Sequence, residues 1–166
     1  MALVDGMLKE LEQEAQTTRR VLERVQDDHL AWRPHKKART LGELALHIAT
    51  VPGAVAELVG THTTVQAPQF TDAKPTSASE LIPALDESIA KARRVLSGMD
   101  DEALMATWRM MNDGREILAA PRIAMLRSIM LNHWYHHRGQ LTVYLKQLDV
   151  PIPSIYGPSA DENPFA

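Results

Sequence analysis

Residues 131–145 read LNHWYHHRGQLTVYL, and this stretch decides the fold because its histidines and apolar residues repeat at helical spacing. His133 and His137 are four residues apart, so in a helix they lie on one face, one turn apart. That face also carries Leu126, Met130, Gln140, Leu141 and Tyr144. Both histidines are therefore expected to point toward the core of a helical protein.

Three other segments show the same periodicity, and the helix that contains the two histidines is itself long. Apolar residues recur every three or four positions in the ranges 4–30, 40–58 and 77–96, and the last helix is predicted from Pro121 to Leu148. Thr40 and Ser77 each precede a glutamate by three residues, which is the spacing of a capping box at a helix start. The sequence thus predicts an all-α protein, a four-helix bundle formed by a single domain over residues 1–166.

Two interruptions of this pattern carry their own predictions. Pro52 lies inside the second helix and removes a backbone hydrogen bond, so a kink is expected at residues 51–53. The polar segment 60–75 is expected to be a long connection. Residues 108–118 alternate loosely around Asn112-Asp113-Gly114, which suits either a short hairpin or an extended loop before the last helix.

The composition excludes several kinds of site. The chain has no cysteine, which rules out disulfides, thiolate metal ligands and a catalytic thiol. The net charge is −3, and the arginine pairs 19–20 and 93–94 fall on predicted helix faces, so no nucleic-acid partner is expected. No membrane partner is expected either, because no apolar run reaches the length of a span and the start MALVDGMLKELEQEA does not resemble a signal peptide. A cytoplasmic location follows as an expectation.

The paired histidines on a core face require a partner for their ring nitrogens. Two protonated imidazoles would repel each other there, and two neutral ones would still need hydrogen-bond partners. One divalent cation, bound by an unprotonated nitrogen of each ring, would avoid the repulsion and give each ring a partner. His47, in the apolar stripe of the second helix, is the candidate third ligand, although a single histidine on such a face is more often a hydrogen-bonded core residue. Trp134 stands where a zinc metalloprotease motif would need glutamate, so that class is set aside.

The remaining histidines and one glycine receive other roles. His136 is expected to be an outer hydrogen-bond donor or an interface residue, while the histidines at 29, 35 and 62 are expected to be exposed. Gly139 is unfavourable inside a helix, and the close approach of another helix, for example from a second subunit, would explain it.

The sequence resembles the DinB-like (damage-inducible) family, which belongs to the same broad superfamily as the YfiT-like proteins. The resemblance rests on TLGELALHIATVPG, LNHWYHHRGQLTVYLKQLDVPIP, the tail SIYGPSADE and DDHLAWRPH, and covers nearly the whole chain. It implies a four-helix bundle, often a homodimer, with His47, His133 and His137 as the metal ligands. It also implies activities that include thiol-dependent S-transferases, a thiol-dependent isomerase and hydrolases.

A three-histidine site leaves a divalent metal, expected to be zinc or nickel, with an open position, as in catalytic sites. The expected function is therefore a metal-dependent S-transferase that joins a low-molecular-weight thiol to a small electrophile, or a related hydrolase. Gln140 and Tyr144 could orient the ligand or serve only internal packing and hydrogen bonding. The alternative is a non-catalytic stress-response binding protein in which the metal staples two helices.

Overall fold

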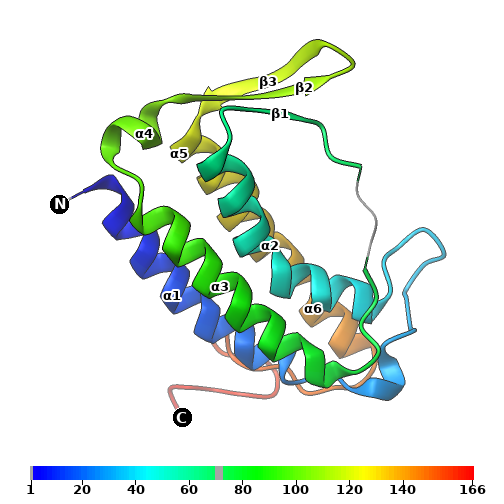
Figure 1. Ribbon diagram of the computed structural model, residues 1–166. Coiled ribbons are helices and arrows are strands. Elements are labelled where there is room, and N and C mark those ends of the chain that lie inside the picture. Colours follow the sequence, from blue (N-terminus) through cyan, green and yellow to red (C-terminus); the bar gives the residue numbers. More distant parts are fainter. Residues whose placement is uncertain (1, 70–72) are drawn as a thin grey trace.

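The computed structural model describes residues 2–69 and 73–166, and the part of the predicted 60–75 connection at 70–72 lies outside the described residues. In the described chain, four long helices run side by side and form the bundle (Figure 1). They are α1 (Leu3–Leu22), α2 (Leu41–Thr61), α3 (Leu81–Ser97) and α6 (His133–Gln147). Helix α2 packs against both α3 and α6, and this places it at the centre of the packing. The predicted four-helix bundle is confirmed.

The first helix is shorter than its apolar stripe suggested, and the prediction that it continues to Leu30 is wrong. Helix α1 ends at Leu22, and a single 3-10 turn, η1 (Asp27–His29), follows after Gln26 adopts an extended backbone. The Asp27 carboxylate accepts the backbone N–H of Ala78 at 2.6 Å, so this turn is tied to the segment that begins α3. His29, the last residue of this turn, is half-buried rather than exposed as expected.

Both predicted capping boxes are confirmed. The Thr40 hydroxyl accepts the Glu43 N–H at 3.1 Å, and the Glu43 carboxylate accepts the Thr40 N–H at 2.7 Å. Glu80 accepts the Ser77 N–H at 3.1 Å in the 3-10 turn η2 (Ala78–Glu80), which leads directly into α3. Each box satisfies backbone donors that a helix start otherwise leaves unpaired.

Pro52 lies inside an uninterrupted α2, and the kink expected there stays a prediction. Next to the proline, the Gly53 N–H donates to Ser88 Oγ at 2.8 Å, and the Ser88 hydroxyl donates to the Thr50 carbonyl at 3.1 Å. A Cβ at position 53 would lie 2.7 Å from the Ser88 carbonyl oxygen. Glycine is therefore required for this close approach of α3 to α2.

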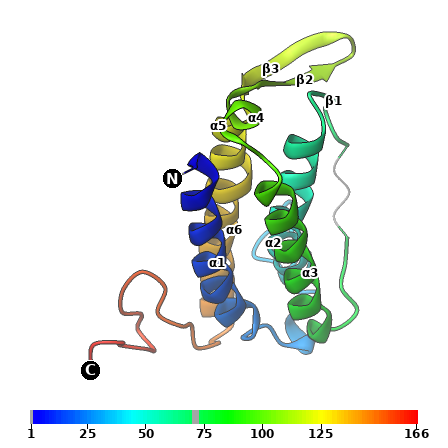
Figure 2. The ribbon, with the colours of Figure 1, turned by 60° about the vertical axis from the view of Figure 1, so that its left-hand side comes forward.

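The hairpin alternative for residues 108–118 is confirmed, and it belongs to a small sheet that the sequence did not predict. Strands β1 (Thr64–Gln66), β2 (Thr107–Asn112) and β3 (Arg115–Pro121) lie in that order, with β1 parallel and β3 antiparallel to β2. Positive φ values at Asp113 (48°) and Gly114 (79°) form the tight turn between β2 and β3. The sheet lies at one end of the bundle, and the short helix α4 (Asp101–Met105) directly precedes β2 (Figure 2).

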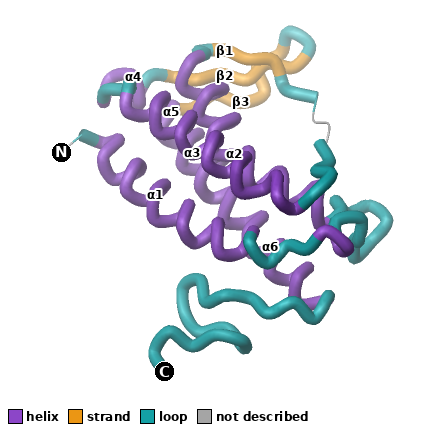
Figure 3. The backbone as a smooth tube through the Cα atoms, turned by 60° about the horizontal axis from the view of Figure 1, so that its bottom comes forward, coloured by secondary structure: helices purple, strands orange, loops and turns teal. Residues whose placement is uncertain are grey.

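The last helical segment begins at Arg122, one residue after the predicted start at Pro121, and has three consecutive parts. Helix α5 (Arg122–Met125) leads into the π-helical segment η3 (Leu126–Asn132), and α6 follows without a break. Such wider turns often occur next to functional sites, and this one ends at the residue before His133. The irregular tail after α6 packs back against the bundle (Figure 3), since the Tyr156 hydroxyl donates to Glu14 at 2.9 Å.

Helix α2 is long and apolar enough, by length and composition, to cross a membrane. Half of its most apolar window is buried inside the protein, however, as is usual for the central helix of a bundle.

Candidate metal centre

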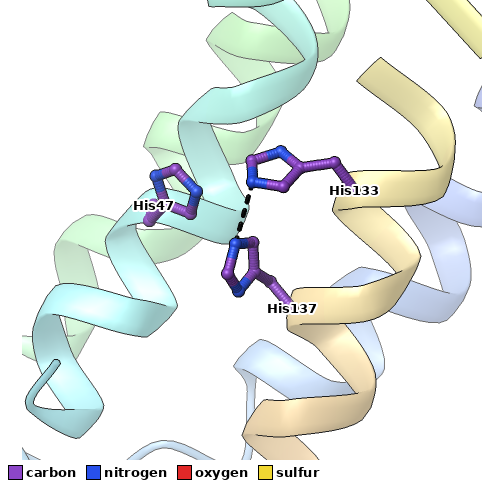
Figure 4. Close-up of side chains that lie close together, drawn as sticks. All are labelled: His47, His133 and His137. Atoms are coloured by element: carbon purple, nitrogen blue, oxygen red, sulfur yellow. Dashed lines mark hydrogen bonds between the residues drawn. The ribbon is translucent and has the colours of Figure 1, made fainter. Parts of the chain in front are cut away.

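The structure brings His47 together with His133 and His137. His47 extends from α2 toward α6, which carries the other two (Figure 4). One ring nitrogen from each residue can be chosen so that all three lie within 4.8 Å of one another. The Nε2 atoms of His133 and His137 are 2.9 Å apart, and the three rings are nearly perpendicular in every pair. Two helices far apart in the sequence thus supply one compact group of nitrogens.

The packing of α2 and α6 explains why the group forms at this level of the bundle. Leu44 and Ile48 on α2 are fully buried, and so are Trp134 and Leu141 on α6. His47 and His133 lie at the border of this apolar contact and are half-buried, whereas His137 is 9% exposed. The histidines therefore sit between the core and the surface.

Burial favours the neutral form of the two imidazoles of α6. The pKa of His133 is lowered, mainly because burial penalises the charged ring, and the nearby positive charge of Arg39 acts in the same direction. The pKa of His137 is lowered by burial first and also by the charges of His133 and Arg39. A neutral imidazole is the form that binds a metal, so this environment favours ligation over protonation.

Gln140 and Tyr144 form a chain of hydrogen bonds that leads away from the three rings. Gln140 Oε1 lies 2.9 Å from His137 Nδ1, as a carbonyl oxygen accepting the ring N–H. The Gln140 amide donates to the Tyr144 hydroxyl at 3.4 Å, which donates to the Arg39 carbonyl at 3.4 Å. Because Gln140 holds a proton on Nδ1, the electron pair of His137 is left on Nε2, the atom that faces His133. Of the two roles considered for this pair, the structure shows internal hydrogen bonding.

The donor set fits a divalent transition metal. Two ligands of a tetrahedral zinc ion, each about 2.05 Å from it, are roughly 3.3 Å apart. The 2.9 Å contact between the Nε2 atoms of His133 and His137 lies just below that separation, and the 4.8 Å limit for the whole group lies above it. Within residues 2–69 and 73–166, no fourth histidine, aspartate or glutamate joins the group. The three histidines could hold a metal while leaving a coordination position open.

Sequence reasoning assigned no role to two neighbours of the histidines. Trp134 donates from its indole Nε1 to the carbonyl oxygen of Ile48, and Arg138 pairs with the buried Glu14. No short motif signals either contact, since the partners are 86 and 124 residues apart. His136 is exposed, with its ring centroid 5.0 Å from that of His137.

Known proteins resemble this chain along nearly its whole length. The family model for the DinB family matches residues 2–163. The uncharacterised protein YrdA of Bacillus subtilis (strain 168) is 30% identical, and the match covers 96% of this chain and 91% of YrdA.

Solved structures agree with that match. A DinB-like protein from Bacillus cereus ATCC 10987 has a TM-score of 0.71 and 27% identity, covering 92% of this chain and 97% of its own. The DinB-like protein YjoA from Bacillus subtilis has a TM-score of 0.67 and 19% identity, and the match covers 90% of this chain and 97% of YjoA. At this identity the likeness supports the fold alone.

Proposed function

The chain belongs to the DinB family, and from this premise we propose that it is a metal-dependent enzyme: a thiol-dependent S-transferase acting on small electrophiles, or a closely related hydrolase. The observation that carries the proposal is the group of three histidines with no fourth His, Asp or Glu ligand in the described chain. Three neutral ligands and an open position are typical of catalytic metal sites, whereas structural sites are closed by four protein ligands.

Each residue of the centre has a defined task in this proposal. His47, His133 and His137 would hold one divalent transition metal, zinc or nickel, through unprotonated ring nitrogens. When bound, such a metal is a Lewis acid that lowers the pKa of a thiol or of water. Gln140 fixes the proton of His137 on Nδ1, and Tyr144 fixes Gln140.

Partial exposure of the centre supports a catalytic role. His47 and His133 are half-buried rather than fully buried, so the centre lies at the border between the core and the surface. The chain has no cysteine, so the attacking sulfur would come from a low-molecular-weight thiol in solution. We further propose that the protein is a cytoplasmic homodimer.

One observation favours a second candidate function. The three histidines come from two different helices, so a metal held among them would link α2 to α6. In that case the metal would be a structural staple, and the protein would act as a stress-response binding module.

The test is a search for thiol adducts. The protein, loaded with zinc or nickel, is incubated with 1-chloro-2,4-dinitrobenzene or monobromobimane and with cysteine, glutathione or coenzyme A in turn, and adducts are quantified by mass spectrometry. We expect metal-dependent adduct formation with at least one thiol, and its loss in His137→Ala. His62→Ala, which removes an exposed histidine outside the group, is the matched control and should retain activity. Adduct formation that is equal in wild type and His137→Ala would contradict the proposal.

A further inference from the structure

Pro52 leaves one carbonyl of α2 without its usual partner. In an α-helix the N–H of each residue bonds to the carbonyl four residues earlier, and proline has no N–H. The residue four positions before Pro52 is Ile48, which is fully buried and directly follows His47. A buried carbonyl in this position needs a donor from elsewhere in the protein.

That donor is the side chain of Trp134. Its indole Nε1 lies 2.8 Å from the Ile48 carbonyl oxygen, in a fully buried contact between α6 and α2. Trp134 directly follows His133. The hydrogen bond therefore joins the backbone next to one histidine of the group to the side chain next to another.

We propose that Trp134 is a positioning residue for the metal centre, holding α2 against α6 at the level where His47 meets His133 and His137. This inference rests on the proposed metal centre. Apolar packing between the two helices is non-directional and tolerates sliding or rotation, whereas a short hydrogen bond restricts both. A metal site needs its ligands held to within about 0.5 Å, which packing alone does not guarantee. Pro52 favours the interaction because it has no N–H and therefore does not share the Ile48 carbonyl with the indole.

The chain contains a matched control for this interaction. Trp108 on β2 is also fully buried, and its indole Nε1 donates to the Leu58 carbonyl of the same helix α2 at 3.4 Å. Leu58 lies three helical turns beyond His47, near the end of α2 that adjoins the sheet. Replacing Trp108 therefore removes a buried indole and its bond to α2 without touching the level of the histidines.

The experiment compares Trp134→Phe with Trp108→Phe in the full chain. Zinc affinity is measured by competition with a chromophoric chelator, the cobalt-loaded proteins are examined by visible absorption, and melting temperatures are recorded without metal. Trp134→Phe should bind zinc about tenfold more weakly, as when a partner beyond the ligands is removed. Its cobalt spectrum should also change. Trp108→Phe should lower the melting temperature but keep the affinity and the cobalt spectrum of wild type. The proposal is overturned if both variants retain wild-type affinity and spectrum, or if both lose affinity equally.

A second variant decides the question if Trp134→Phe does not fold. Pro52→Ala restores a backbone N–H that shares the Ile48 carbonyl with the indole and so weakens the indole bond, and it favours the helix itself. We expect weaker zinc binding together with an unchanged or higher melting temperature. Unchanged zinc affinity in this variant would overturn the positioning role. A wild-type protein that binds neither zinc nor nickel would instead contradict the proposed metal centre itself. Failure of the positioning role and failure of the metal centre are therefore distinguishable.

Discussion

Arg138 and Glu14 form an ion pair inside the bundle, with 2.6 Å between Nη1 and Oε2 and side chains that are only 2% and 8% exposed. The guanidinium also donates to the Thr18 hydroxyl at 3.2 Å and packs against the rings of Tyr135 and Tyr156. Arg138 directly follows His137, so the pair fastens one face of α6 to α1 while the adjacent face carries the histidines. The pair thereby helps to hold in place the helix that presents two of the three ring nitrogens.

Removing only one of the two charges of this ion pair should strongly destabilise the protein. Glu14→Leu leaves a buried, unpaired guanidinium and is expected to lower the free energy of unfolding by about 3–5 kcal/mol. Glu14→Leu combined with Arg138→Met removes both charges and should cost much less. Urea unfolding followed by circular dichroism measures each value. Glu12→Leu is the control, because Glu12 pairs with Arg93 on the surface and should cost no more than about 1 kcal/mol. Equal effects of the two single substitutions would contradict a special role for the buried pair.

The bond between Gln140 and His137 should matter for metal affinity more than for stability. Gln140→Leu removes the acceptor of the His137 Nδ1–H and is expected to weaken zinc binding about 10- to 100-fold. Gln140→Glu keeps an acceptor and should largely preserve binding. Gln147→Leu alters an exposed glutamine on the same helix and serves as the control. Isothermal titration with zinc provides the measurement, and an affinity of Gln140→Leu equal to that of Gln147→Leu would count against the assignment.

Local patterns in the sequence account for most of the bundle and for the grouping of the histidines. The apolar stripes predicted four long helices, Thr40–Glu43 and Ser77–Glu80 marked two helix starts, and Asp113–Gly114 allowed a hairpin. The spacing of His133 and His137 placed them on one face, because helical geometry depends only on residues a few positions apart. His47 followed because an apolar stripe of a bundle faces the core.

The features that the sequence did not reveal depend on partners distant along the chain. β1 is only Thr64–Gln66, and it exists because β2 offers it a parallel edge. Helix α1 ends at Leu22, and the turn that follows it is tied to a distant segment because the Asp27 carboxylate accepts the backbone N–H of Ala78. The bond from Trp134 to Ile48 likewise depends on a carbonyl that Pro52 leaves free, which becomes visible only once α2 and α6 are side by side.

Gly139 provides a test of the proposed homodimer. A Cβ at this position would meet no atom within 4 Å in the single chain, so Gly139→Ala should raise the stability of the monomer by up to about 1 kcal/mol. If α6 of a second copy approaches here, the added methyl group should also weaken association, which light scattering over a range of concentrations would detect. Gly6→Ala in α1 is the control, because it also meets no atom within 4 Å. A wild-type protein that is monomeric at micromolar concentration would refute the homodimer.

Removal of the metal should leave a folded bundle, and this separates catalysis from a structural staple. All four long helices contribute buried apolar residues to one continuous core, including Leu11, Leu44, Leu85 and Leu141, so the burial that stabilises the fold does not depend on an ion. A metal present at 100 times its dissociation constant adds about 2.7 kcal/mol by mass action. For a chain of this length, that corresponds to roughly 5–10 °C in melting temperature.

We therefore expect the chelated wild type to keep its helical circular dichroism at 25 °C and to melt cooperatively, with His137→Ala melting close to it. A staple predicts the opposite, because α2 and α6 would then separate when the ligand or the metal is removed. Loss of helical signal at 25 °C on chelation, together with no thiol adduct from any electrophile tested, would replace the enzymatic interpretation with the structural one.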